Sequence, residues 1–190
     1  WYSMLDDPAY YDRIRERVEI TFPPSQPRFY GANDPVTVNV DIKNVDKMIV
    51  KTYQINTVNY YADAQREVDA TVRVEGLVPS QETTHSYSES PFRRVRRTFS
   101  LDELSRPGVY VVDFIGNGLA SRAVIIKGRL RYQHRVGAAG HVFRVLDESG
   151  EHLKDASIVL GGREFHADES GEVLIPYSTR RGRKKIILKQ

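Results

Sequence analysis

Residues 108–127, "GVYVVDFIGNGLASRAVIIK", hold two runs rich in Val, Ile and aromatic residues, separated by Gly116-Asn117-Gly118. Such runs are typical of β-strands, because branched and aromatic side chains pack well on a pleated surface. Gly-Asn-Gly provides the positive φ angles that a tight hairpin requires. We therefore predict a buried strand over 108–115, a turn at 116–118 and a returning strand from residue 121.

The same preference for strands appears on both sides of this hairpin. Within 36–43, every second residue is Val or Ile and the others are polar, which predicts a half-buried strand. Short strands at regular spacing, without alternating helices, predict an all-β fold of tandem Ig-like, antiparallel sandwiches. The further strands are expected over 48–55, 68–74, 93–101, 141–147, 155–160, 163–168, 172–178 and 184–190.

The N-terminal end carries a helical pattern. Asp7 is suited to the N-cap and Pro8 to the first helical position, and apolar residues then recur every four positions up to Val18. We expect residues 1–22 to be a short helix or linker that belongs to a preceding domain. Several prolines in 23–35 then predict an extended segment at a sheet edge, since proline cannot donate to a ladder.

Glycines and small residues in "LRYQHRVGAAG", residues 130–140, predict a linker between two β modules. We therefore expect modules over 23–132 and 136–190. The second, at roughly 55 residues, is small for independent stability. We expect it to depend on the first module or on strands beyond Gln190.

The composition excludes several classes of site. The chain has 190 residues, of which 40% are hydrophobic, and no cysteine, so disulfides, a cysteine nucleophile and a thioester are excluded. The net charge of +3 is mild and does not indicate nucleic acid. No stretch approaches the roughly 18 apolar residues of a membrane helix, so no membrane insertion is expected in this segment. Because the chain begins with Trp1, we expect it to be part of a longer protein.

No catalytic, cofactor-binding or metal-binding residues are predicted. The histidines show no metal-ligand spacing such as H-x-H or H-E-x-x-H, and there is no P-loop or G-x-S-x-G motif. We therefore expect no cofactor and no enzymatic activity. The five histidines are His85, His134, His141, His152 and His166.

Two basic clusters, 93–97 and 180–185, are candidate sites for phosphate or an acidic polysaccharide. In the first, Arg94 and Arg96 alternate with Val95, which is typical of a strand with one solvated face, and edge arginines also prevent sheet-to-sheet association. No aromatic stacking platform accompanies either cluster, so nucleic-acid binding is not expected. Tyrosines in 29–30 and 59–61 could line a sugar-binding surface, but ordinary strand positions are favoured.

The pentapeptide "DESGE" occurs at 147–151 and again at 168–172. An EF-hand calcium loop needs glycine at its sixth position, whereas here glycine is fourth and apolar residues follow closely. Asp-x-x-Gly instead predicts two hairpin turns. The aspartate side chain begins each turn, and Gly150 or Gly171 takes a positive φ angle.

The spacing of these turns carries a family resemblance. Residues 143–178 resemble the transthyretin-like module of carboxypeptidase regulatory domains and macroglobulin repeats. Residues 103–132 are similar to the last strands of a macroglobulin domain, and the order of the two pieces resembles the N-terminal repeats of bacterial-type alpha-2-macroglobulins. The positions that match the module are Asp147, Gly150, Leu153, Ala156, Ile158, Leu160, Asp168 and Gly171.

This resemblance implies a non-catalytic structural segment of a larger extracytoplasmic protein, located in the periplasm, at the cell surface or outside the cell. The segment would act as scaffold for a protease inhibitor, with the neighbouring domains of the parent chain and a protease as partners. The alternative is a cell-surface adhesion or carbohydrate-binding module that uses tyrosines and arginines such as Tyr60 and Arg94.

Overall fold

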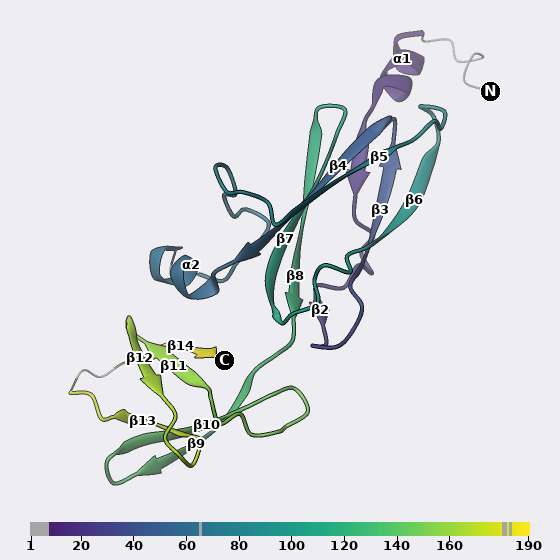
Figure 1. The fold of residues 1–190 in the computed structure, drawn as a ribbon. Helices are drawn as coiled ribbons and strands as arrows, with labels where there is room; N and C mark the ends of the chain where they lie inside the picture. Colours follow the sequence, from purple (N-terminus) through teal and green to yellow (C-terminus); the bar gives the residue numbers. More distant parts are fainter. Residues whose placement is uncertain (1–7, 65, 180–181, 183) are drawn as a thin grey trace. The chain divides into compact units, whose positions relative to one another are not determined.

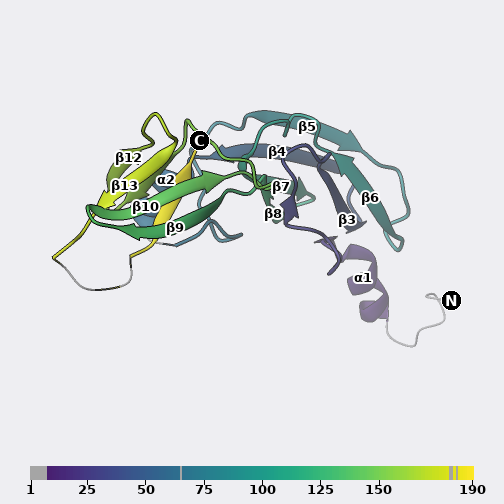
Figure 2. The ribbon, with the colours of Figure 1, turned by 90° about the horizontal axis from the view of Figure 1, so that it is seen from below.

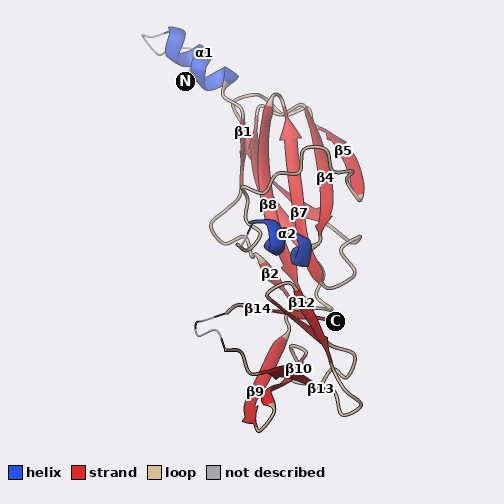
Figure 3. Cartoon of the chain, turned by 90° about the vertical axis from the view of Figure 1, so that its left-hand side faces the viewer, coloured by secondary structure: helices blue, strands red, loops and turns tan. Residues whose placement is uncertain are grey.

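The computed structural model describes residues 8–64, 66–179, 182 and 184–190, and most of its regular structure is β-strand (Figure 3). The predicted all-β fold is confirmed. Among the described residues, neither short helix is long and apolar enough to cross a membrane. The chain divides into two compact units, residues 1–55 with 68–127, and residues 56–67 with 128–190.

The first unit is a sandwich in which a three-stranded sheet, β1-β3-β6, covers a five-stranded sheet, β2-β8-β7-β4-β5 (Figure 1). All pairings are antiparallel except that of β2 with β8, which is parallel. Its elements are α1 (Pro8–Glu16), β1 (Glu19–Thr21), β2 (Phe29–Tyr30), β3 (Thr37–Lys43), β4 (Lys47–Ile55), β5 (Gln81–Ser86), β6 (Arg94–Ser100), β7 (Gly108–Gly116) and β8 (Leu119–Lys127).

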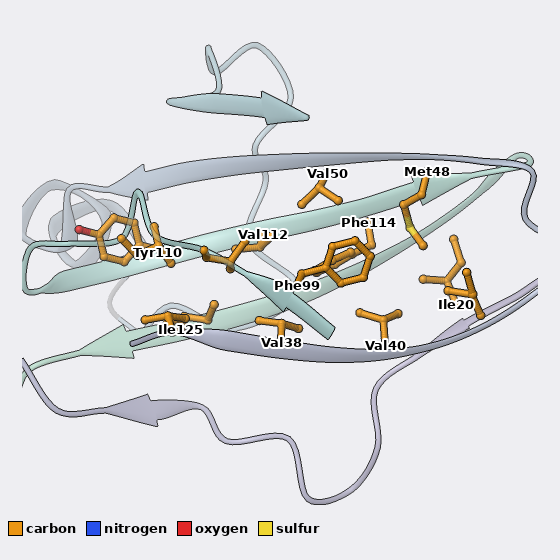
Figure 4. Packing of buried hydrophobic residues seen from close by; sticks show 14 of the residues in the cluster. Ile20, Val38, Val40, Met48, Val50, Phe99, Tyr110, Val112, Phe114 and Ile125 are labelled. Carbon is orange, nitrogen blue, oxygen red and sulfur yellow. The ribbon is translucent and has the colours of Figure 1, made fainter. Parts of the chain in front are cut away.

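The core between these two sheets follows from the alternating sequence. Val38 and Val40 of β3 point inward and meet Val112 and Phe114 of β7, and all four are fully buried (Figure 4). The Phe114 ring packs edge-on against Phe99 of β6, with ring centroids 5.1 Å apart. The period of two therefore directs one side of each strand into a shared apolar layer.

The hairpin at 116–118 is confirmed, with a different use for its first glycine. Asn117 and Gly118 take the positive φ angles, 44° and 79°. Gly116 does not, but a Cβ there would lie 2.7 Å from the Val45 side chain and 2.9 Å from the Lys47 carbonyl. Gly116 is needed because the neighbouring chain passes so close.

The N-terminal prediction needs correction, because residues 19–21 form β1 and pair with β3. Ile20 enters the core, and α1 is tied to the same unit. The buried Lys43 Nζ donates to the Ile14 and Arg17 carbonyls, as suits a cation at a helix C-terminus. Burial lowers the pKa of Lys43, and nearby Glu19 partly opposes this. Asp7, the predicted N-cap, lies outside the described residues.

The strand predicted over 68–74 is wrong. Val68, Val72 and Val74 are buried, but the segment is irregular. Asp69 Oδ1 accepts bonds from the backbone N–H and hydroxyl of Thr71, which replaces strand geometry with a local turn. The segment covers the outer face of the five-stranded sheet.

The second unit is a smaller sandwich, in which the sheet β13-β10-β9 faces the sheet β12-β11-β14. Its core contains Phe143, Val145, Ile158 and Val173. Figure 2 shows β9 and β10 side by side within this unit. Its elements are α2 (Thr57–Ala64), β9 (Arg131–Gly137), β10 (Gly140–Leu146), β11 (Ser157–Leu160), β12 (Arg163–His166), β13 (Glu172–Pro176) and β14 (Ile186–Lys189).

Two features of the second unit differ from the sequence prediction. Residues 130–140, predicted as a linker, form most of the β9–β10 hairpin instead, because Gly137 and Gly140 close a turn between two paired strands. Helix α2 was not predicted; it follows β4 in the chain but groups with the second unit. Lys185 lies over the Tyr61 ring of α2 at 5.7 Å.

We predict that Phe114→Ala destabilises the first unit by about 3–5 kcal/mol, because it removes a fully buried ring and leaves a cavity. Urea unfolding followed by circular dichroism measures the loss. The control is Val78→Ala, at a side chain that is 88% exposed, with an expected change within about 0.5 kcal/mol. Equal effects of the two substitutions would contradict the core assignment.

Candidate functional site

The first basic cluster is neutralised by acidic partners. On β6, Arg94 pairs with Glu19, and Arg96 makes two bonds to Asp41, at 2.7 and 2.8 Å. The Arg96 guanidinium holds the pKa of Asp41 below its ordinary value. These pairs join β6 to β1 and β3 across the surface of one sheet. The exposed arginines therefore serve sheet pairing rather than presenting uncompensated positive charge.

Arg97 differs from its neighbours, because it lies on the same side of β6 as Val95 and Phe99. It pairs with Glu89, and its guanidinium carbon lies 4.8 Å from the centroid of the Tyr87 ring. The ring face attracts a cation, so Arg97 is held from two directions. In the second cluster, Arg180, Arg181 and Arg183 lie outside the described residues.

The tyrosines proposed for a sugar surface do not lie in one unit. Tyr30 belongs to the first unit, where its hydroxyl donates to the Thr37 carbonyl at 2.5 Å. Burial raises the pKa of Tyr30. Tyr60 and Tyr61 lie on α2 and group with the second unit. The combination of Tyr60 with Arg94, on which the carbohydrate alternative depends, is therefore split between the units.

No group of three or more His, Asp or Glu side chains suited to a metal ion occurs in the part of the chain that the structure describes. Two histidines do meet: His134 Nε2 and His141 Nδ1 are 2.9 Å apart. The register of the β9–β10 hairpin pairs His134 with Phe143, which puts His134 and His141 on one face. Sequence reasoning missed this pair because it assigned the hairpin as a linker.

The pair belongs to the lining of a hollow of about 440 Å³ in the second unit. Phe143 stacks on the His134 ring at 4.7 Å, and Tyr177 meets the His141 ring edge-on at 5.3 Å. Apolar side chains from both sheets complete the wall, including Leu160 and Ile175, and Lys184 provides a cation. This lining suits contact with apolar or aromatic groups.

Both DESGE turns have the predicted local geometry. Asp147 Oδ1 accepts from the Ser149 hydroxyl at 2.7 Å and from the Glu151 N–H at 2.8 Å. Asp168 Oδ1 does the same with Ser170 and Glu172. Gly150 and Gly171 take φ angles of 89° and 78°. One carboxylate oxygen of each aspartate, Oδ1, is thus occupied within its own turn.

Both turns reverse the chain as predicted, and Leu146 pairs with His152 across the first, but the longer strands on either side of each turn do not pair with each other. The first connects β10 to β11 and the second connects β12 to β13, and each pair belongs to two different sheets. The His152 ring, through Nε2, donates to the Gly171 carbonyl at 2.9 Å and so links the two turns. Each DESGE turn therefore carries the chain from one sheet to the other, and the bond from His152 to Gly171 joins the two turns.

A buried ion pair lies on the outer face of the five-stranded sheet. Arg122 of β8 makes two bonds to Asp113 of β7, at 2.5 and 2.8 Å. The bonds to Asp113 raise the pKa of Arg122. Arg122 also donates to the Val72 carbonyl, and Arg28 donates to the Val68 carbonyl at 2.6 Å. These bonds hold the irregular segment 68–74 over the sheet.

We predict that Arg122→Met destabilises the first unit by about 1.5–3 kcal/mol, since it leaves the buried Asp113 carboxylate unpaired. The double variant Arg122→Met with Asp113→Val should recover part of this loss, because neither partner then remains charged. Urea unfolding of the single and double variants provides the measurement. Arg96→Met, at the exposed pair with Asp41, is the control and should cost less. A double variant that is no more stable than Arg122→Met contradicts this assignment.

The turns predict an acid dependence. Bonds from Ser149 and Ser170 hold the pKa of Asp147 and Asp168 below the ordinary value, which is about 3.9. Their stabilisation is therefore present above that value and is lost as pH falls through the lowered folded-state pKa. Asp147→Asn with Asp168→Asn should flatten the loss of urea midpoint between about pH 5 and pH 2. The wild type and the double variant are compared in high salt, which screens distant charges. Identical pH profiles of the two would refute the role of these aspartates.

Comparison with known proteins supports this fold. Residues 48–128, from β4 through β8, match the family model of the AbpF first immunoglobulin-like domain. Actin-binding protein F of Dictyostelium discoideum is 32% identical in an alignment of 190 residues that covers 99% of this chain. The chain spans only 8% of the length of that relative.

Solved structures add a fold likeness. Native alpha-2-macroglobulin from Escherichia coli, spanning domains MG0-NIE-MG1, aligns with a TM-score of 0.52 and 11% identity over 90% of this chain and 63% of that one. Its NIE-MG1 segment aligns with a TM-score of 0.50 and 12% identity over 90% of this chain and 96% of that one. The chain thus contains an Ig-like β-sandwich with a macroglobulin-like fold.

Proposed function

We propose that the chain is a non-catalytic structural segment, two β-sandwich units in tandem, within a longer macroglobulin-like protein. The observation that most supports this proposal is that 99% of this chain aligns with 8% of a much longer relative. The alignment spans both units, which supports their acting together as one small section of a long protein. We also propose, more specifically, that the second unit is a transthyretin-like module.

The internal pairing of charged groups supports this role. The arginines of β6 and the Arg122–Asp113 pair are used to join strands, and the aspartates of the DESGE turns are used to close turns. General acid–base catalysis requires a titratable group that can reach a substrate, and these groups already have structural partners. A scaffold has no such requirement.

We further propose that this segment is part of the scaffold of a protease inhibitor, with a protease as partner and an extracytoplasmic location. This part of the proposal rests on the fold likeness to alpha-2-macroglobulin at 11–12% identity. The protease-inhibitor role is thus a more specific version of the structural proposal.

A second candidate function is contact with actin. The observation that favours it is the 32% identity to a protein named for actin binding, over nearly this whole chain. Because the chain spans 8% of that relative, the actin-binding region of the relative has ample room to lie elsewhere. The two candidates also differ in compartment, since actin filaments assemble inside cells.

High-speed co-sedimentation of the 190-residue chain with actin filaments separates the two candidates. We expect the chain to remain in the supernatant at physiological salt, where weak attraction by its net charge of +3 is screened. Saturable pelleting at that salt would overturn the structural proposal in favour of actin contact. Bovine serum albumin, which remains in the supernatant, serves as the control for trapping.

A further inference from the structure

One side of the second unit is open. Within the part of the chain that the structure describes, β9 pairs only with β10, and β14 pairs only with β11. Strands β12 and β13 lie close together, so the free edges of β9 and β14 share the opposite side of the sandwich. The hollow described above lies there, lined by Tyr132 and His134 from β9 and Ile186 from β14.

Among the residues that the structure describes, few cover the core-directed side of β9. In the β9–β10 register, Tyr132 pairs with the buried Val145, and His134 pairs with the buried Phe143, so these side chains point toward the interior. Yet Tyr132 is 51% exposed, and Val136, on the same side, is 65% exposed. Side chains on the inner face of a sandwich are normally buried between the sheets. The facing sheet therefore stops short of β9.

We propose that this open side binds an extended segment of a partner protein, which adds to β9 as a further strand. A free strand edge offers unpaired N–H and C=O groups, and these recognise an extended backbone. Every second side chain of the added strand would point into the hollow, where Tyr132, Phe143 and Ile186 favour apolar groups.

Charge specifies the other side chains of the partner. Arg131 and Arg135 lie on the outer face of β9 and are exposed. Arg135 is ion-paired with Glu172 of β13 at 2.7 Å, so Arg131 is the cation that can meet an acidic partner. Residues directly opposite on neighbouring strands interact, and opposite charges contribute roughly 0.2–1 kcal/mol for each pair. The segment that fits best therefore alternates apolar with acidic residues.

A second copy of this chain fits less well. If β9 of two copies paired with their apolar sides together, Arg131 of both would lie on one outer face, where Arg135 is already paired with Glu172. Like charges facing each other across strands are destabilising. The basic edge therefore opposes self-pairing while it favours an acidic strand.

The test uses the 190-residue chain and two fluorescent seven-residue peptides that match the length of β9. One alternates Glu with Val and the other alternates Lys with Val. Fluorescence anisotropy should show saturable binding of the acidic peptide, at least about tenfold tighter than the basic one. Hydrogen exchange should slow at β9 when the acidic peptide is bound. No saturable binding of the acidic peptide, or equal binding of both peptides, would overturn the proposal.

Three variants locate the site. Val136→Lys introduces a charge toward the hollow at an exposed position and should weaken binding about tenfold or more. Arg131→Glu should shift the preference toward the Lys–Val peptide. Leu174→Lys is the matched control, because it changes an exposed apolar residue on the outer face of the same sheet and should leave binding unchanged. Equal losses in Val136→Lys and Leu174→Lys would argue against the open side.

The same variants test for self-association. Sedimentation velocity of the wild-type chain should show no concentration-dependent dimer formed through β9. A dimer that Val136→Lys abolishes would assign the open side to a second copy and overturn the proposed partner.

Discussion

The first unit depends on the burial of both faces of one strand, β7. Val111 and Val112 are adjacent residues of β7 that point to opposite faces of the sheet, and both are fully buried. The inner face is covered by the other sheet of the sandwich, and the outer face by the irregular segment 68–74. Covering the outer face requires the Arg122–Asp113 pair, because the charged groups there need partners once water is excluded. The two arginines that hold the segment by its carbonyls thus complete a core that the two sheets alone leave open.

This arrangement explains which parts of the fold the sequence could predict. Strands β3, β7 and β8 were predicted because alternation or a dense apolar run is visible within each. The polar β5 was missed because all of its residues except His85 are exposed, so no apolar alternation marks it. Segment 68–74 was predicted as a strand because its valines are spaced like one. In the fold, Asp69 accepts bonds from Thr71 in a local turn, and Arg28 and Arg122 hold the carbonyls of Val68 and Val72, so the segment does not join a ladder.

The candidate sites show the same limit on a smaller scale. The DESGE turns were predicted correctly in their local geometry, because an aspartate that accepts bonds from the residues after it and a glycine with positive φ are properties of five adjacent residues. Which strands the turns connect depends on distant pairing, and the bond from His152 to Gly171 has no local signature. The meeting of His134 and His141 was equally hidden, since it requires the register of a hairpin that had been assigned as a linker.

The two units treat their sheet edges differently, and this difference bears on function. In the first unit, β5 is polar, β6 carries paired arginines, and β1 and β2 have only three and two residues. Short or charged edges of this kind prevent association with other chains. In the second unit, β9 is seven residues long and points Tyr132 and Val136 toward an interior that does not cover them. An edge that is long, apolar on its inner side and carries the exposed Arg131 on its outer side disfavours a second copy of itself more than an acidic strand. Selective exposure of this kind is what a docking edge requires.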